Sequence, residues 1–147
     1  MRYDELISRM ITRRAELHLA QWELGDLTGI MQTSISNFER GRITMTVKSM
    51  LALLGGLDMR LTVDGRDVNT CGDMMAAINR ARLTQRRRLE DVLAECGYSS
   101  TAFYSWSNRE IGNVRAPRVL DVMTALKLDV KIREVKQCRS IAHNGEH

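Results

Sequence analysis

The chain repeats a helix-then-strand pattern, and this repeat limits the fold more than any other feature of the sequence. In each half, apolar residues recur at positions i, i+3, i+4 and i+7, the spacing of one buried helix face. They are Val47, Met50, Leu51 and Leu54 and, at an offset of 72, Val119, Val122, Met123 and Leu126. A period-two alternation follows each stripe, over Leu57–Val63 and Leu128–Ile132. We therefore expect each half to end in a helix followed by a half-buried strand.

The middle of the two halves also matches. Residues 27–38 (LTGIMQTSISNF) align with residues 95–106 (ECGYSSTAFYSW) at an offset of 68. Gly29 and Gly97 stand where a helix ends and the chain turns, a place that favours the left-handed conformation of glycine. The pattern predicts, in each half, two helices joined by a glycine-containing turn. Trp106, near the end of the second match, is expected in the core.

A segment rich in turn residues separates the halves. Residues 65–72 contain two glycines and no apolar period, which is typical of a linker. We therefore expect a first domain over residues 1–64 and a second over residues 73–136. Asp73 is the expected N-cap of the first helix after the linker. Residues 137–147 form a tail that is expected to fray.

Composition excludes several classes of protein. The 147 residues are 44% hydrophobic and 27% charged, which suits one ordinary domain or two small ones. The longest apolar stretch, Met50–Leu54, is too short to span a bilayer. The first residues turn acidic where a secretory signal would be basic and then apolar. These features predict a cytoplasmic protein with no membrane partner.

The sequence shows no pattern of a catalytic or metal site. The three cysteines lack a CxxC spacing and the three histidines are scattered, so neither a disulfide framework nor a zinc site is expected. A glycine-rich phosphate loop and a Ser/His/Asp arrangement are also missing. We therefore expect no enzyme activity, no metal and no cofactor.

The charge permits a polyanionic partner without requiring one. The formal net charge is +4, and five arginines crowd into nine positions of the second half. This cluster is either a solvated helix face or a patch that contacts phosphate. Its members are Arg80, Arg82, Arg86, Arg87 and Arg88.

Short polar side chains follow the first glycine turn and suit the reading of DNA bases. Amides pair with adenine and a threonine methyl touches thymine in the major groove, which makes Gln32, Thr33, Ser36 and Asn37 candidate base contacts. Candidate phosphate contacts, which hold register without reading sequence, are Arg14, Gln21, Arg40 and Arg42. The alternative is that all of these are ordinary exposed polar residues of a small helical bundle.

An ordered set of motif residues lies within residues 6–57. It comprises Arg14, Gln21, Leu24, Leu27, Gly29-Ile30, Ile35-Ser36 and Glu39-Arg40-Gly41-Arg42. This set resembles the signature of the Cro/repressor (XRE) helix-turn-helix family. The resemblance implies a five-helix DNA-binding domain in which Arg14 and Gln21 touch phosphate and the first residues of the third helix read bases. Met31 departs from the family, which usually has a capping serine or threonine there.

The second half is similar to the same family over fewer motifs. Gly97–Ser100 and Ser105-Trp106 resemble the turn and third helix, and Thr84-Gln85 is similar to Ala20-Gln21. The Glu-x-Gly motif after the third helix is missing. The resemblance implies base contacts by Ser100, Thr101 and Tyr104, and phosphate contacts by Arg86, Arg109 and Arg115. It implies a mainly α fold of two tandem five-helix, lambda-repressor-like units, each followed by a short β-strand.

Residues 53–61 (LLGGLDMRL) are similar to the end of Hip-type antitoxins, in which a strand from each subunit pairs across the dimer axis. Here both strands lie in one chain, and exposed strand edges otherwise invite aggregation. We therefore expect Leu57–Val63 to pair with Leu128–Ile132. One polypeptide would then imitate a dimer, with two third helices about one DNA turn apart. Its oligomeric state would be a monomeric pseudo-dimer or a homodimer.

Two functions are consistent with these patterns. The first is a sequence-specific regulator of transcription that binds double-stranded DNA and acts as a repressor. The resemblance implies association with a bacterial nucleoid, or an origin in a phage or mobile element. The second is a protein-binding module, either an antitoxin that holds a toxin or an anti-activator that docks on a transcription factor.

Overall fold

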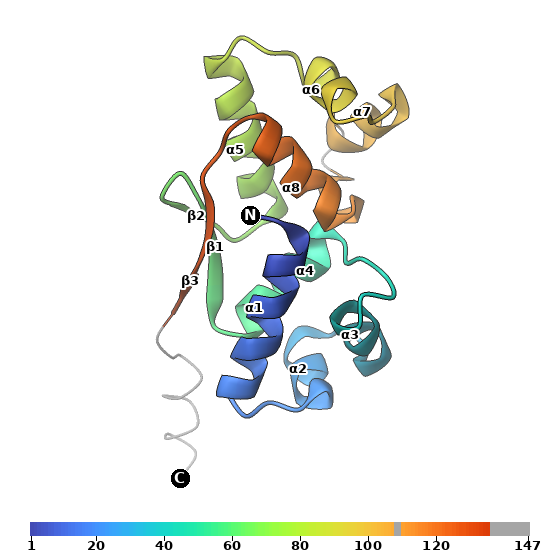
Figure 1. Cartoon of the computed structure of the whole chain (residues 1–147), viewed down its shortest axis with the longest axis vertical. Coiled ribbons are helices and arrows are strands. Elements are labelled where there is room, and N and C mark those ends of the chain that lie inside the picture. The colour runs from blue at the N-terminus through green and yellow to red at the C-terminus, as the bar shows by residue number, and fades with distance from the viewer. Residues whose placement is uncertain (108–109, 136–147) are drawn as a thin grey trace.

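The computed structural model describes residues 1–107 and 110–135, which form eight α-helices, one 3-10 helix and three strands (Figure 1). The first half contains α1 (Tyr3–Glu16), α2 (Gln21–Thr28), α3 (Gln32–Glu39), α4 (Val47–Gly56) and β1 (Met59–Val63). A short strand, β2 (Arg66–Val68), follows. The second half contains α5 (Cys71–Thr84), α6 (Leu89–Glu95), α7 (Ser100–Ser107), η1 (Glu110–Asn113), α8 (Ala116–Ala125) and β3 (Val130–Glu134). The protein is mainly α-helical with a small sheet.

The two halves repeat one order of elements. Helices α5, α6 and α7 begin 68 positions after α1, α2 and α3, and α8 begins 69 positions after α4. The strand β3 begins 71 positions after β1. The turns repeat as well, because His18 and Arg86 both have a positive φ, as do Gly29 and Gly97. Each half thus has four α-helices and a strand within the described residues, and the fifth helix expected in each unit does not occur among them.

The predicted offset of 72 between the two apolar stripes is wrong. The helix bounds make Met50 the counterpart of Val119 and Leu54 the counterpart of Met123, at an offset of 69, and all four are buried. Apolar positions on one helix face recur every three or four residues, so an alignment shifted by three keeps them on that face. Apolar periodicity alone therefore predicts which face of a helix is buried, but it does not fix the alignment of one half with the other.

A second alignment differs for a similar reason. Thr84-Gln85 ends α5 and caps it, and does not begin a helix as Ala20-Gln21 does. Helix α6 begins at Leu89, with Arg88 as N-cap, so Leu89 is the counterpart of Gln21. The second helix of the second half is consequently seven residues long, close to the eight of α2.

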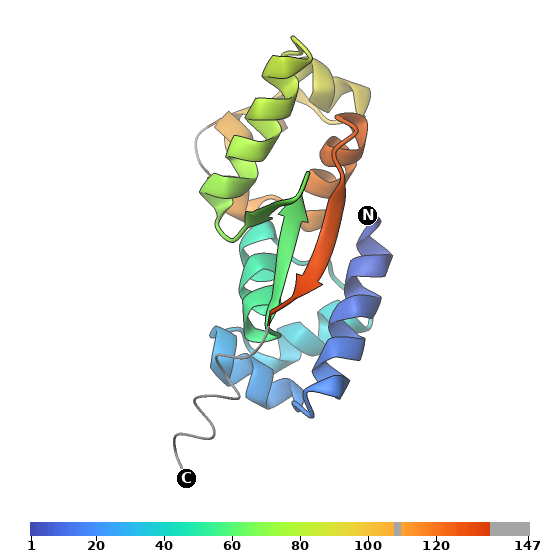
Figure 2. The same ribbon diagram turned by 90° about the vertical axis from the view of Figure 1, so that its left-hand side faces the viewer.

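The two halves meet through paired strands. β1 and β3 are antiparallel, and Leu61 stands opposite Ile132, its own counterpart at the offset of 71 (Figure 2). Such self-pairing of equivalent residues is the geometry of a two-fold dimer interface. The predicted pairing of Leu57–Val63 with Leu128–Ile132 is confirmed, over Met59–Val63 and Val130–Glu134.

A second contact between the halves has the same symmetry. Thr46, the N-cap of α4, forms an antiparallel bridge with Arg115, the N-cap of α8. The two residues are counterparts at the offset of 69 that relates these helices. Flanking bonds run from Val47 N–H to Val114 O (2.9 Å) and from Ala116 N–H to Met45 O (2.8 Å). Each of these two backbone pairings between the halves is therefore centred on a pair of equivalent residues.

The segment predicted as a linker, residues 65–72, contains secondary structure. β2 pairs with β1 on the side opposite β3, which gives the strand order β2-β1-β3. Thr70, and not Asp73, is the N-cap of α5, because Thr70 Oγ1 accepts from Asp73 N–H at 3.0 Å. Asp73 instead accepts from Thr70 N–H at 3.2 Å, which completes a capping box. A strand of three residues is too short to be read from alternation.

One apolar core runs through both halves. The helices α1, α4 and α8 lie on one side of the sheet, and their buried side chains meet the inner face of β1 (Figure 1). Leu6 and Met74, equivalent residues in the first turns of α1 and α5, are fully buried. Trp106 is 1% exposed, which confirms its expected place in the core. The helices α3 and α7 pack on this core from the side away from the sheet (Figures 1 and 2).

Candidate nucleic-acid interface

Helix α3 presents polar side chains on its outer face. Two of the four predicted base contacts, Gln32 and Thr33, are exposed, and the other two, Ser36 and Asn37, are half-buried. Ile35 in the same helix is 1% exposed and anchors the helix to the core. The structure therefore brings the four predicted residues together on one short helix whose outer face is open.

The position of α3 depends on a close approach to α2. A Cβ added at Gly25 would lie 2.7 Å from Ile30 O, so a side chain at this position would push the two helices apart. Gly29 ends α2 with a φ of 75°, the left-handed conformation that glycine adopts cheaply. The turn predicted at Gly29 is confirmed, and Gly25 is a second requirement that the sequence analysis did not identify.

A half-buried polar cluster, formed by Arg14, Gln21 and Glu39 and called here the Glu39 cluster, ties α1 and α2 to the end of α3. Arg14 Nε and Nη2 donate to the two carboxylate oxygens of Glu39 at 2.8 and 2.7 Å. Gln21 Nε2 donates to the same carboxylate at 3.0 Å, and Arg14 Nη1 donates to Leu19 O at 2.9 Å. The hydrogen bond to Glu39 is the main cause that raises the pKa of Arg14. The Glu39 cluster therefore joins α1 to α3 by a bidentate ion pair and α2 to α3 by an amide hydrogen bond.

The Glu39 cluster bears on two predicted phosphate contacts. Arg14 and Gln21 donate within the chain, and the side chain of Arg14 is only 20% exposed. Their first role in this structure is to hold α3 in place. A phosphate role for either stays a prediction.

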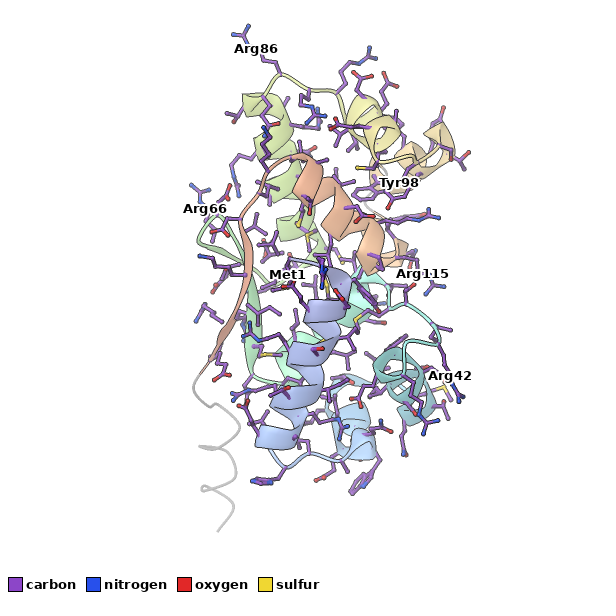
Figure 3. All side chains as sticks on the ribbon, viewed as in Figure 1. Met1, Arg42, Arg66, Arg86, Tyr98 and Arg115 are labelled. Atoms are coloured by element: carbon purple, nitrogen blue, oxygen red, sulfur yellow. The ribbon has the colours of Figure 1, made fainter. Side chains whose placement is uncertain are left out.

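Other predicted phosphate contacts lie in the open. Arg40 and Arg42 follow α3 and are exposed. Arg115 is exposed at the start of α8, and its Nη1 donates to Thr44 O at 2.8 Å, which holds one side of its guanidinium against the loop after α3. Figure 3 shows Arg42 and Arg115 on the edge of the molecule that carries α3 and α7. Arg86 lies at the turn between α5 and α6, at the top of that view and away from this edge.

Helix α7 occupies in the second half the place of α3 in the first. Thr101 is exposed, and Tyr104 is 65% exposed with its ring packed edge-on against Phe103. Ser100 is the first residue of the helix, and its side chain lies outside what the structure describes, as does Arg109. The structure thus places the predicted second reading helix on the same side of the molecule as α3 (Figure 1).

Tyr98 fastens the start of α7 to α8 and was not identified from the sequence. Its hydroxyl donates to Asp121 Oδ2 at 2.6 Å, and the guanidinium of Arg118 lies 5.2 Å from its ring centroid. Burial, followed by the hydrogen bond to Asp121, raises the pKa of Tyr98 far above its usual value. The counterpart of Tyr98 in the first half is Ile30. An aromatic residue beside a helix start carries no pattern that reveals a partner 23 residues away.

Three large apolar side chains around α2 remain exposed. Trp22 is 57% exposed, Leu27 is 53% exposed, and Met31, at the N-cap of α3, is 71% exposed. Exposing apolar side chains to water is less favourable in free energy than exposing polar ones, and a group of exposed apolar side chains often marks a contact with a macromolecule. Met31 directly precedes α3, and Trp22 and Leu27 lie in α2, the helix before it.

The described residues contain no group of three or more His, Cys, Asp or Glu side chains placed to hold a metal ion. Among the same residues, no helix is long and apolar enough to cross a membrane. In comparisons with known proteins, no family model, no curated sequence and no solved structure matched the chain.

Proposed function

We propose that the protein binds double-stranded DNA sequence-specifically and represses transcription by occupying a promoter. The observation that supports this most is that α3 and α7 lie on one side of the molecule, related by the same symmetry that pairs Leu61 with Ile132. Two-fold proteins that read DNA place two such helices in successive major grooves, about one helical turn apart. A single chain would here supply both.

In this proposal the third helix of each half contacts bases, and exposed arginines outside these helices contact phosphates. Gln32, Thr33, Ser36 and Asn37 read base edges from α3, while Thr101 and Tyr104 do so from α7. Arg40, Arg42 and Arg115 contact phosphates, because all three are exposed. Arg40 directly follows α3, and Arg42 and Arg115 lie on the edge that carries α3 and α7 (Figure 3). The Glu39 cluster acts indirectly, since it fixes the orientation of α3 relative to α1 and α2.

The first experiment is selection of bound sequences from a random duplex library at about physiological salt, where nonspecific binding by basic residues weakens. The proposal expects enrichment of two half-sites about one turn apart. A single enriched half-site would mean that only the first half reads bases. Absence of any enrichment would overturn the proposal.

Matched arginine variants then locate the DNA-facing side. Arg42→Ala removes a charge from the edge with α3 and α7, and Arg66→Ala removes the same charge from the opposite side of the molecule (Figure 3). Fluorescence anisotropy at several salt concentrations should show a lower affinity and a shallower salt dependence for Arg42→Ala alone. Equal losses for the two variants would contradict the assigned face.

Gln32→Ala separates reading from positioning. Loss of an amide that pairs with a base should cost about 1–3 kcal/mol on the selected sequence and almost nothing on random DNA. An equal loss on both kinds of DNA would remove Gln32 from the base-reading residues.

The exposed side chains Trp22, Leu27 and Met31 favour a second candidate, a protein-binding module that docks on a toxin or a transcription factor. Under this reading, Trp22→Ser would abolish capture of the partner and leave folding unchanged. If the library shows no enrichment while Trp22→Ser abolishes a stable protein complex, the second candidate replaces the first.

A further inference from the structure

A large cavity opens in the second half, between α5, α6 and α7. Its volume is about 840 Å³, and its apolar lining includes Met75, Leu89, Phe103, Trp106 and Ile111. The corresponding region of the first half, around Ile7 and Ile35, encloses only about 10 Å³. Small-molecule sites in proteins have volumes of several hundred cubic ångströms and mostly apolar linings, so the second half is hollow where the first is packed.

The sequence explains why this space is open. In the first half, the partly buried Tyr3 packs on the core, and its hydroxyl accepts from Met45 N–H at 3.0 Å. Its counterpart at the offset of 68 is Cys71, which lines the cavity with a much smaller side chain. Ile11 corresponds in the same way to Asn79, another lining residue. The second half thus lacks the side chains that close the gap between the first helix and the third.

The polar side chains of the cavity lining include two arginines and one carboxylate, Arg82, Arg88 and Glu90. Glu90 pairs with Arg88, so among the described residues Arg82 is the lining arginine that has no carboxylate partner. Arg82 is the counterpart of Arg14 and lines the cavity. The carboxylate of Glu39 binds Arg14, but the residue at the position of Glu39 in the second half is Ser107. Arg82 Nε donates to Asn79 Oδ1 at 2.9 Å, and no carboxylate of residues 1–107 or 110–135 pairs with its guanidinium.

We propose that this cavity binds a small amphipathic monocarboxylate, whose apolar body fills the space against Phe103 and Trp106 and whose carboxylate pairs with Arg82. The ligand would supply to Arg82 the group that Glu39 supplies to Arg14. Planar bidentate pairing between guanidinium and carboxylate gives the site its chemical selectivity. A bound ligand would also join α5 to α7, as the Glu39 cluster joins α1 to α3.

The inference goes beyond the proposed function and does not depend on it, because the test uses the full chain without DNA. Decanoate is the probe, with decan-1-ol and decylamine as controls that keep the chain and change the head group. The protein has two tryptophans, so Trp22→Phe leaves Trp106, in the cavity wall, as the reporter of binding by fluorescence. Titration calorimetry gives the affinity and the stoichiometry.

We expect one molecule of decanoate to bind per chain and to change the emission of Trp106. Decan-1-ol should bind about tenfold more weakly or worse, since it lacks the charge-assisted hydrogen bonds, and decylamine weaker still. Equal affinity for decanoate and decan-1-ol, or no binding of decanoate, would overturn the proposal. By calorimetry this comparison is made on the unchanged protein, so it does not rely on a variant that has to fold.

A matched pair of variants tests the role of Arg82. Arg82→Met keeps most of the stem and removes the guanidinium, while Arg80→Met makes the same change at an exposed position of α5 that does not line the cavity. Arg82→Met should weaken decanoate binding about tenfold and leave decan-1-ol binding unchanged. Decanoate affinity that is unchanged in Arg82→Met, or equally reduced in both variants, would show that Arg82 does not recognise the carboxylate.

Discussion

The two halves share one order of elements but stabilise their third helices differently. In the first half the Glu39 cluster binds α3 to α1 and α2 with three hydrogen bonds to the Glu39 carboxylate, and only about 10 Å³ of the region beneath is empty. In the second half the counterparts of Gln21 and Glu39 are Leu89 and Ser107, and about 840 Å³ lies open beside α7. Instead, α7 is fastened at its start, where Tyr98 binds Asp121.

This difference shows that two halves can keep the same backbone arrangement while the side-chain interactions that stabilise it differ. The contacts between the halves lie on the symmetric elements, whereas the polar contacts within each half have diverged. Any function that needs both third helices therefore depends on two unlike sets of supporting interactions.

The largest expected effect comes from a charge placed in the contact between the halves. Met59 is 1% exposed, so Met59→Lys should cost more than about 4 kcal/mol in the free energy of unfolding, because an unpaired ammonium would be buried. Its counterpart Val130 is 8% exposed at the strand's start, so Val130→Lys should cost only about 2 kcal/mol as the lysine reaches water. Urea denaturation measures both losses.

Lys131→Gln is the control for these strand variants, because Lys131 is exposed in β3 and its change should stay within about 0.5 kcal/mol. If Met59→Lys left both the denaturation midpoint and the size-exclusion profile unchanged, the pairing of β1 with β3 would not be what holds the halves together.

The next effect tests the Glu39 cluster. Glu39→Ala leaves Arg14, at 20% exposure, without its carboxylate and should cost about 2–3 kcal/mol. The double variant Arg14→Met/Glu39→Leu should be more stable than Glu39→Ala, because it removes the unpaired charge as well. In the second half, the cluster is represented by Arg82, the counterpart of Arg14, and Arg82→Ala should cost less than about 1 kcal/mol because no carboxylate among the described residues pairs with it. Similar losses for Glu39→Ala and Arg82→Ala would erase the distinction between the halves.

A slightly smaller effect concerns the approach of α2 to α3. Gly25→Ala should cost about 2 kcal/mol, because its Cβ would lie 2.7 Å from Ile30 O. The counterpart in the second half is the buried Leu93, so α6 tolerates a side chain that α2 does not. Gly55→Ala is the control: Gly55 lies in α4 with nothing within 4 Å of an added Cβ, so alanine should stabilise by about 0.5 kcal/mol. Destabilisation by Gly55→Ala equal to that of Gly25→Ala would refute the steric argument.

The smallest effect addresses whether both third helices read DNA. Thr33 and Thr101 are the same residue at equivalent, exposed positions. If both halves read bases, as we propose, Thr33→Ala and Thr101→Ala should each weaken binding to the selected sequence by about 1 kcal/mol, or roughly fivefold. Anisotropy titrations measure both. A loss confined to Thr33→Ala would restrict base reading to α3.

The sequence predicted those parts of the fold that depend on short-range patterns. The turn at Gly29 and the alternation that became β1 and β3 are local features, and the pairing of the two strands followed from their similarity. The register between the halves was misjudged because an apolar stripe looks alike after a shift of three residues. β2 was missed because three residues carry too little pattern.

The supporting interactions of the candidate site could not be predicted in the same way. Glu39 belonged to a recognised motif, but its partner Arg14 lies 25 residues away, and both the pair and the approach at Gly25 exist only once α1, α2 and α3 have packed. The cavity in the second half follows from the smaller side chain at Cys71 relative to Tyr3. Its presence depends on how far apart the helix axes lie, which a single sequence does not state.

The pairing of β1 with β3 inside one polypeptide also has a consequence for dilution. Two identical subunits that meet through such strands separate when their concentration falls below the dissociation constant, but tethered halves keep a high local concentration at any dilution. A single molecule in a cell would thus retain both third helices. In a fused pair the two halves can differ in sequence, so each third helix can acquire its own binding preference. Such a protein is suited to a target whose two half-sites differ. A dimer of identical subunits would fit only one of those half-sites.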